Sequence, residues 1–161
     1  MNSIHELIAS HTTADDKERR DRDAILAGLA DGTLEIIGSD HAPHCSYEKE
    51  VEFDFAPFGI IGLETELALS LELVRKKILN LRALVEKFTV NPARLLRLQE
   101  GTLSVGANAD ITVIDPEREW IYDVAQSASK SRNSPFHGWK LRGRALTTVV
   151  KGKVVWRETE K

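Results

Sequence analysis

The stretch TLEIIGSDHAPH, residues 33–44, joins a hydrophobic, β-branched run to a short turn that is rich in titratable side chains. Thr33–Gly38 predicts a β-strand, and the residues after it predict a loop. Asp40, His41 and His44 all fall within that loop. In α/β proteins the carboxyl ends of parallel strands carry the catalytic groups. The loop is therefore the first candidate for a functional site.

The residue types in this loop allow two interpretations. Asp40 at the end of a strand can ligate a metal, act as a general base, or do both. Pro43 fixes part of the turn, so that His44 can reach the same pocket. The same spacing also occurs in structural loops, where an aspartate caps backbone N–H groups and a histidine packs on an aromatic ring. From the residues alone the two interpretations have about equal weight.

The composition excludes several classes of protein. The chain has 161 residues, of which 42% are hydrophobic and 29% charged, and this suits one globular domain or two small ones. A net charge of −3 gives no general attraction to nucleic acid or to anionic membranes. The single cysteine, Cys45, cannot form an intramolecular disulfide. The sequence has no apolar run of the ~20 residues that span a bilayer and no signal-peptide pattern, so a cytoplasmic protein is expected.

The residues before Gly101 predict mostly helices. A polar loop with several aromatic residues covers residues 39–58, and a loop of this length is typically functional or disordered. Asn91 is expected to cap one short helix, with Pro92 in its first turn. The other predicted helices cover residues 14–31, 62–77 and 81–88.

The residues from Gly101 onward predict strands. Alternating, β-branched segments cover residues 109–115, 119–123 and 147–156, and Lys151–Gly152 within the last predicts a hairpin or a strand with a tight bend. The order of elements therefore indicates an α/β portion over residues 1–100 and a β portion over residues 101–161.

Three longer stretches carry a resemblance to a known family. GSDHAPH followed by APFGIIGLET (Ala56–Thr65) resembles the last barrel strand and the glycine-rich segment after it in dihydroorotases of the amidohydrolase superfamily. NPARLLRLQEGTLSVGANADITVIDPE (Asn91–Glu117) resembles the ending common to that superfamily, and SKSRNSPFHGWKLRGR and VVKGKVVW are similar to its usual tail. The resemblance implies an α/β fold: the end of a (β/α)₈ amidohydrolase barrel, with strand 8 and its helices over residues 1–100, joined to a small β-sandwich-type portion over residues 101–161.

The resemblance also implies an activity. Dihydroorotases hydrolyse the cyclic amide of dihydroorotate reversibly to N-carbamoyl-aspartate in pyrimidine biosynthesis, with zinc as the metal. Asp40 matches the position of the family's metal-binding aspartate. It is therefore expected to bind the metal and to act as the catalytic acid–base group, taking a proton from the attacking water and giving it to the departing ring nitrogen.

Further residues are expected to bind the substrate. By the same resemblance, His44 would hold the substrate carboxylate, and Phe58 and Gly59 would offer backbone groups to the pyrimidine ring. For His41 a role in supporting the loop, together with Pro43, is as well founded as a contact with substrate.

The sequence departs from the family upstream of the loop. The family places a His-X-His pair on its first strand, whereas this chain has no such pair, and the two histidines ahead of the loop are His5 and His11. A complete barrel also needs roughly 200–250 residues. We therefore expect the carboxyl-terminal part of a dihydroorotase, incomplete and inactive by itself, which does not hold zinc tightly. An unpaired barrel strand would favour a homo-oligomer or association with a missing amino-terminal half.

Two other interpretations remain open. The chain could be a non-catalytic remnant or assembly domain, or part of another cyclic amidohydrolase of the allantoinase or hydantoinase type.

Overall fold

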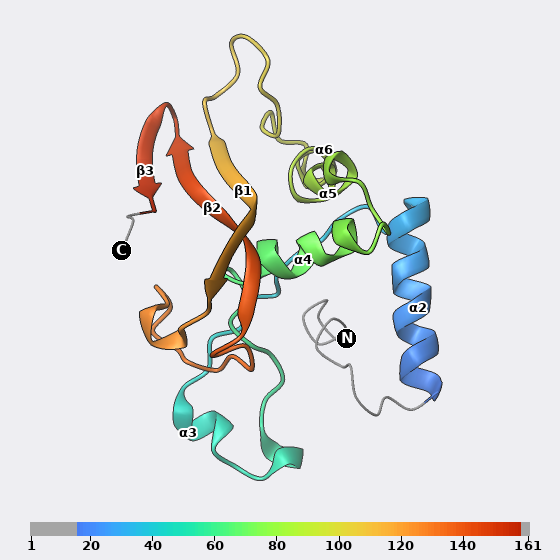
Figure 1. The fold of residues 1–161 in the computed structure, drawn as a ribbon, viewed down its shortest axis with the longest axis vertical. Coiled ribbons are helices and arrows are strands. Elements are labelled where there is room, and N and C mark those ends of the chain that lie inside the picture. The colour runs from blue at the N-terminus through green and yellow to red at the C-terminus, as the bar shows by residue number, and fades with distance from the viewer. Residues whose placement is uncertain (1–15, 159–161) are drawn as a thin grey trace.

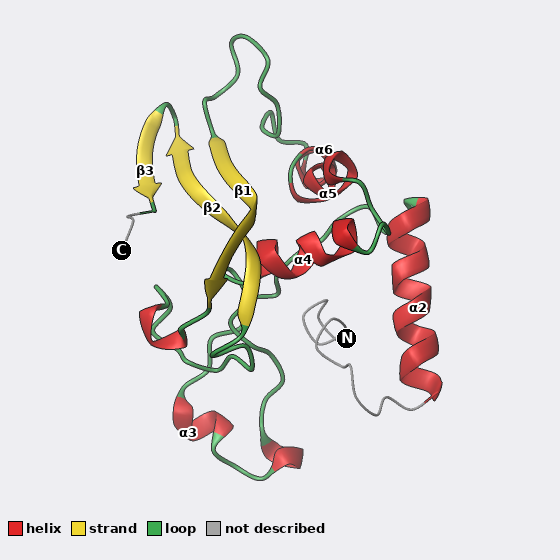
Figure 2. Cartoon of the chain, in the orientation of Figure 1, coloured by secondary structure: helices red, strands yellow, loops and turns green. Residues whose placement is uncertain are grey.

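A computed structural model of the chain describes residues 16–158 (Figure 1). Helices precede Gly101 and a three-stranded sheet follows it (Figure 2). The helices are α2 (Asp16–Asp31), α3 (Ser46–Lys49), α4 (Glu66–Arg75), α5 (Leu81–Phe88) and α6 (Val90–Leu96), and single 3-10 turns cover Phe53–Phe55 and Val124–Gln126. The strands are β1 (Ile111–Ile121), β2 (Lys140–Val150) and β3 (Lys153–Arg157). No helix in this described part is long and apolar enough to cross a membrane.

The sheet is antiparallel, with β2 between β1 and β3. Lys151 and Gly152 form the turn between β2 and β3, and their φ angles of 49° and 76° lie in the left-handed region. This is the geometry of a two-residue turn that matches the twist of a hairpin, so the predicted hairpin is confirmed. The two segments predicted at 109–115 and 119–123 form one strand, β1, whose pairing is irregular between Asp115 and Glu119.

The helix α4 connects two hydrophobic clusters, and Figure 1 shows it running from the sheet toward α2. Its residues Leu71 and Leu73 pack with the other helices, whereas Ala68 and Leu69 pack against the β portion. The first cluster contains Leu29, Ile37, Leu71, Leu73, Leu79 and Leu84, and the second contains Ala68, Leu69, Tyr122, Phe136 and Leu141. The apolar residues on more than one face of α4 follow from this double burial.

A glycine allows β2 to approach α4 closely. A Cβ atom added to Gly143 would lie 2.2 Å from Cδ1 of Leu71, and the φ of Gly143 is 103°. At the end of the same helix, Arg75 donates through Nη2 to the carbonyl oxygens of Pro116 and Arg142, at 2.8 and 2.9 Å. The sheet and the helices are therefore joined by both packing and hydrogen bonds.

The helical predictions were mostly confirmed. The helix predicted at 62–77 is shorter, because α4 covers Glu66–Arg75, and the helix at 81–88 is confirmed as α5. Helix α2 begins at Asp16, and residues 14–15 lie outside the described residues. The capping role of Asn91 was wrong. Helix α6 begins at Val90, and the Asn91 side chain donates instead to the carbonyl oxygen of Glu35, at 2.8 Å.

The strand predicted at Thr33–Gly38 was also wrong, because these residues form no strand. The three strands of the described part follow Gly101 and pair within their own sheet. Helix α5 contacts its backbone instead. The amide of Ile37 donates to the carbonyl of Lys87 at 3.2 Å, and Nζ of Lys87 donates to the carbonyl of Leu34. Ile37 is buried in the helical cluster, so the apolar pattern reports burial without sheet pairing.

Candidate functional site

Two loops lie side by side at the candidate site: the motif loop, residues 39–45, and the glycine loop, residues 57–62. The amide of Ala42 donates to the carbonyl of Ile60 at 2.9 Å. On either side of this bond, His44 contacts Phe58 and His41 contacts Gly62. The loops therefore run antiparallel, and both histidines of the motif loop contact the glycine loop.

Asp40 is exposed and has a φ of 45°, in the left-handed region. A residue other than glycine is uncommon there, although aspartate is among those that tolerate it best. Such conformations cluster at functional sites, where the surrounding structure imposes them. The Asp40 carboxylate is accessible to a ligand from outside the chain.

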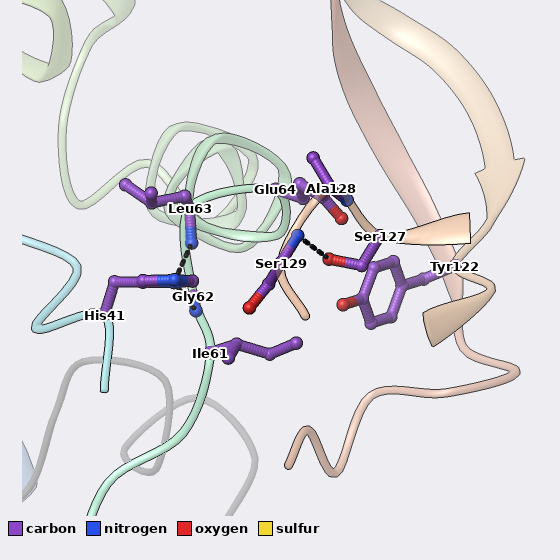
Figure 3. Close-up of a pocket in the computed structure, with 9 residues that line it drawn as sticks. All are labelled: His41, Ile61, Gly62, Leu63, Glu64, Tyr122, Ser127, Ala128 and Ser129. Atoms are coloured by element: carbon purple, nitrogen blue, oxygen red, sulfur yellow. Dashed lines mark hydrogen bonds between the residues drawn. The ribbon is translucent and has the colours of Figure 1, made fainter. Parts of the chain in front are cut away.

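His41 fastens the motif loop to the start of the segment that leads into α4. Its Nδ1 accepts hydrogen bonds from the backbone amides of Gly62, at 3.1 Å, and Leu63, at 3.5 Å (Figure 3). An imidazole nitrogen that accepts from N–H carries no proton, so the proton of a neutral His41 ring is on Nε2. Pro43, the other residue predicted to support the loop, is exposed.

His44 contacts Phe58, which is also predicted to bind the substrate. Its Nε2 lies 3.0 Å from the carbonyl oxygen of Phe58, which can only accept, so Nε2 donates. Its Nδ1 lies 3.7 Å from the Glu48 carboxylate. A Cβ atom added to Gly59 would lie 2.5 Å from Cβ of Ala42, and its φ is 109°. Glycine at position 59 is therefore what allows the two loops to approach.

Asn133, from the loop between β1 and β2, was not identified from the sequence. Its Oδ1 accepts from the His44 amide at 3.2 Å, and its Nδ2 donates to the carbonyls of Ala42, at 2.8 Å, and Gly59, at 3.2 Å. Its own carbonyl accepts from the Ile61 amide at 3.1 Å. The resemblance of the surrounding tail to the family was the one signal for it, because no periodic pattern reports such contacts.

Lys49 of α3 is a second support that was missed. Its Nζ donates to the carbonyls of Pro57, at 2.5 Å, and Gly59, at 2.8 Å. The lysine therefore holds the glycine loop through two of its backbone carbonyls. In the sequence it is one charged residue among several in a polar loop, so nothing marked it.

A cavity of about 400 Å³ adjoins the motif loop (Figure 3). Burial, and secondarily the charge of Glu64, raise the pKa of Tyr122 above its ordinary value. Nearby in the sequence, burial raises the pKa of Glu66 to about 7. The cavity is lined by His41, Ile61, Gly62, Leu63, Glu64, Tyr122, Ser127, Ala128 and Ser129.

The described residues do not by themselves fit a zinc ion. No three His, Cys, Asp or Glu side chains gather within residues 16–158 in a way that could hold a metal. Asp40 is available as a ligand, whereas the ring nitrogens of His41 and His44 that have been described contact protein groups. Stable zinc sites use three or four protein ligands. His5 and His11 lie outside the described residues.

Several curated relatives that the chain matches are dihydroorotases. The chain is 56% identical over 137 residues to the dihydroorotase of Geobacter sp. (strain M21), covering 85% of this chain and 32% of that protein. It is 49% identical over 142 residues to the dihydroorotase of Syntrophus aciditrophicus (strain SB), covering 88% and 33%. The chain therefore spans about a third of the length of these relatives.

Solved structures and a family model also match this chain. The L-hydantoinase (dihydropyrimidinase) from Arthrobacter aurescens superposes with a TM-score of 0.80 at 32% identity, covering 98% of this chain and 37% of that one. The expected fold class, an α/β piece of an amidohydrolase with a small β portion, is confirmed by this similarity. Residues 2–155 match the amidohydrolase family along nearly the whole sequence. The chain belongs to the amidohydrolase family.

Proposed function

We propose that this chain supplies the carboxyl-terminal part of a dihydroorotase active site, in which dihydroorotate and water are converted reversibly to N-carbamoyl-aspartate. The observation that carries the proposal is the exposed, left-handed Asp40 in a loop that is fastened at His41, Ala42 and His44. A carboxylate held on a fixed loop is what general acid–base catalysis needs. The identity to curated dihydroorotases supports the choice of substrate.

Asp40 would move one proton in each turnover. It would take the proton from the water that attacks the ring carbonyl carbon, and it would return that proton to the ring nitrogen as the carbon–nitrogen bond breaks. The zinc expected from the resemblance needs at least two further protein ligands, since Asp40 is one and a stable site takes three or four. We propose that those ligands come from outside residues 16–158.

His44 would hold the substrate carboxylate, and the backbone of Phe58 and Gly59 would face the ring. In the structure the Nε2–H of His44 already donates to the Phe58 carbonyl at 3.0 Å. Binding would exchange that neutral acceptor for a carboxylate oxygen, and a bond to a charged acceptor is roughly twice as strong. The loop geometry would therefore keep the proton on Nε2 of His44, and the ring oriented, before the substrate arrives.

We propose an amino-terminal half as the partner that completes the site, with self-association through the same surface when that half is absent. The polar loop over residues 39–58, which contains α3, leaves several aromatic residues in solvent, among them Phe53 and Phe58, which are 88% and 89% exposed. Exposed apolar patches of this kind mark interaction sites. The segment Thr33–Gly38, which precedes that loop in the sequence, pairs with no strand in the described part. It offers backbone groups to a strand of a partner. A cytoplasmic location remains part of the proposal.

A hydantoinase-type activity is the second candidate, because solved structures similar in shape to this chain include hydantoinases and dihydropyrimidinases. The substrate carboxylate separates the two candidates, since dihydroorotate carries one and simple dihydropyrimidines do not. An enzyme that uses His44 to hold a carboxylate should prefer dihydroorotate.

The test is complementation. The chain is mixed with the part of the Geobacter dihydroorotase that precedes the matched region, and the formation of N-carbamoyl-aspartate is measured with dihydroorotate, dihydrouracil and hydantoin in parallel. Dihydroorotate should be the preferred substrate, and Asp40→Asn should lower kcat on the order of 10²–10⁴-fold. The matched control is Asp54→Asn, at an exposed position of the same polar loop, residues 39–58. A mixture that forms a stable complex without turnover would favour the non-catalytic interpretation instead.

A further inference from the structure

We propose that Asn133 is a positioning residue, through which the β portion sets the place and orientation of His44; the link to substrate binding rests on the proposed function. Asn133 lies 89 residues from His44 and 91 from Ala42 in the sequence, yet it contacts the backbone of both. It contacts the glycine loop at Gly59 and Ile61 as well. One side chain and its own carbonyl thus join three segments of the chain.

The contacts require both ends of an amide. His44 offers a backbone donor and Ala42 a backbone acceptor, and Asn133 meets the first with Oδ1 and the second with Nδ2. The second hydrogen of Nδ2 reaches the carbonyl of Gly59. Aspartate would keep the acceptor but lose both donated bonds, and alanine would lose all three. The partners are partly buried, so each unmet group would cost free energy.

The β portion holds Asn133 in turn. Phe136, three residues further on, is fully buried, and its ring packs edge-on against Trp139 with centroids 5.1 Å apart. The chain between them is bonded to the end of β1, because Tyr122 donates to the carbonyl of Trp139 and accepts from Gly138. The position of Asn133 is therefore fixed by the second hydrophobic cluster and is passed on to the motif loop.

The effect on His44 has two routes. The bond to the His44 amide fixes the backbone of His44. The bond to the Gly59 carbonyl fixes the residue that follows Phe58, and the Phe58 carbonyl oxygen in turn accepts from the His44 ring. Without Asn133 the two loops keep the Ala42–Ile60 and His41–Gly62 bonds, but His44 lies at the end of the paired stretch. We expect its ring to lose a fixed acceptor there.

The experiment is nuclear magnetic resonance of the 161-residue chain with Asn133→Ala, Asn133→Asp and a control, Asn91→Ala. Asn91 also donates from its side chain to a remote backbone carbonyl, that of Glu35, but it contacts neither loop of the site. In the parent chain, long-range proton–nitrogen spectra at alkaline pH should show His44 with its proton on Nε2. Asn133→Ala should average the two tautomers and speed exchange of the His44 amide about tenfold. The control should change neither signal.

Asn133→Asp guards against misfolding of the alanine variant, because it keeps the acceptor for the His44 amide. It should leave that amide protected and still release the ring tautomer. If both variants fold and keep a fixed Nε2 tautomer and a protected His44 amide, the positioning role is overturned. In the completed enzyme Asn133→Ala should raise KM for dihydroorotate more than it lowers kcat. The spectra need no turnover, so an inactive complemented enzyme would count against the proposed function and leave the test of Asn133 intact.

Discussion

Two stretches of this chain are hydrophobic and rich in β-branched residues, and they fold differently. Residues 147–156 form a hairpin, whereas Thr33–Gly38 forms no strand and pairs with none in the described part. Each strand of the hairpin has a pairing partner nearby in the sequence, because the two-residue turn at Lys151–Gly152 places β3 beside β2. Thr33–Gly38 has no such neighbour within the described residues, and α5 takes up part of its hydrogen bonding. A strand-forming pattern becomes a strand when a partner lies within reach.

The β portion and the motif loop differ in the same way. The β portion is held by local pairing and a compact cluster, and it orients Asn133. The motif loop and the glycine loop depend on contacts with other segments. Lys49 of α3 donates to the Gly59 carbonyl, and Asn133 of the β portion donates to the Ala42 carbonyl. The His41 ring accepts from the Gly62 amide. We therefore expect the β portion, packed on α4, to be the more stable region and the motif loop to gain order from a partner.

The largest expected effect is in hydrogen exchange. Amides of Glu35 and Ile36 should exchange on the order of 10³-fold faster than those of the central strand β2, because exchange from a paired strand requires unfolding of the sheet. Adding the amino-terminal part of a relative should slow the exchange of Glu35 and Ile36. Mass spectrometry or nuclear magnetic resonance measures both. Equal protection of the two stretches in the isolated chain would mean that Thr33–Gly38 already pairs, and the contrast would fail.

A second substitution tests the junction between the sheet and α4. Gly143→Ala should lower the free energy of unfolding by ~3 kcal/mol, because the added methyl would overlap Cδ1 of Leu71 and the residue has a positive φ. Gly106→Ala is the control, since Gly106 also has a positive φ, of 90°, but has nothing within 4 Å of the added atom. It should cost about 1 kcal/mol. Equal losses in denaturant titrations would show that crowding at Leu71 does not limit the approach of β2.

The smallest expected effect concerns pH. Burial raises the pKa of Glu66 from 4.5 to about 7, so the folded chain binds a proton there more readily than the unfolded chain does. Its contribution to stability is therefore lost as the pH rises from about 4.5 to about 7. Glu66→Gln should remove this slope and stabilise the chain at neutral pH by about 1 kcal/mol, a value reduced for solvent screening. Exposed Glu100→Gln is the control, and an unchanged slope in the Glu66 variant would contradict the assignment.

The sequence predicted those features that depend on neighbours in the chain. Helix α5 and the hairpin follow from periodicity and turn residues that act over a few positions. Asn91 was misassigned because a side chain that caps a helix and one that reaches a distant carbonyl have the same sequence pattern. Asn133 and Lys49 were missed for a related reason. Their partners are backbone groups, whose chemistry is the same at every residue.

The resemblance singled out the motif loop, but the sequence could not reveal how the loop is held. The packing of Gly59 against Ala42 is a property of two backbones that meet, and it needs coordinates to be seen. The functional roles of Asp40, His44, Phe58 and Gly59 remain predictions that the complementation experiment addresses.

The most direct test of the central claim is to assay the purified 161-residue chain, by itself, for hydrolysis of dihydroorotate in the presence of zinc. We predict no ring opening above the uncatalysed rate, because Asp40 and a partial set of imidazoles cannot hold and activate a metal-bound water. Elemental analysis after dialysis should correspondingly find substoichiometric zinc. Turnover together with about one tightly held zinc per chain would contradict the claim, because the remaining ligands would then have to come from this chain or from a second copy of it.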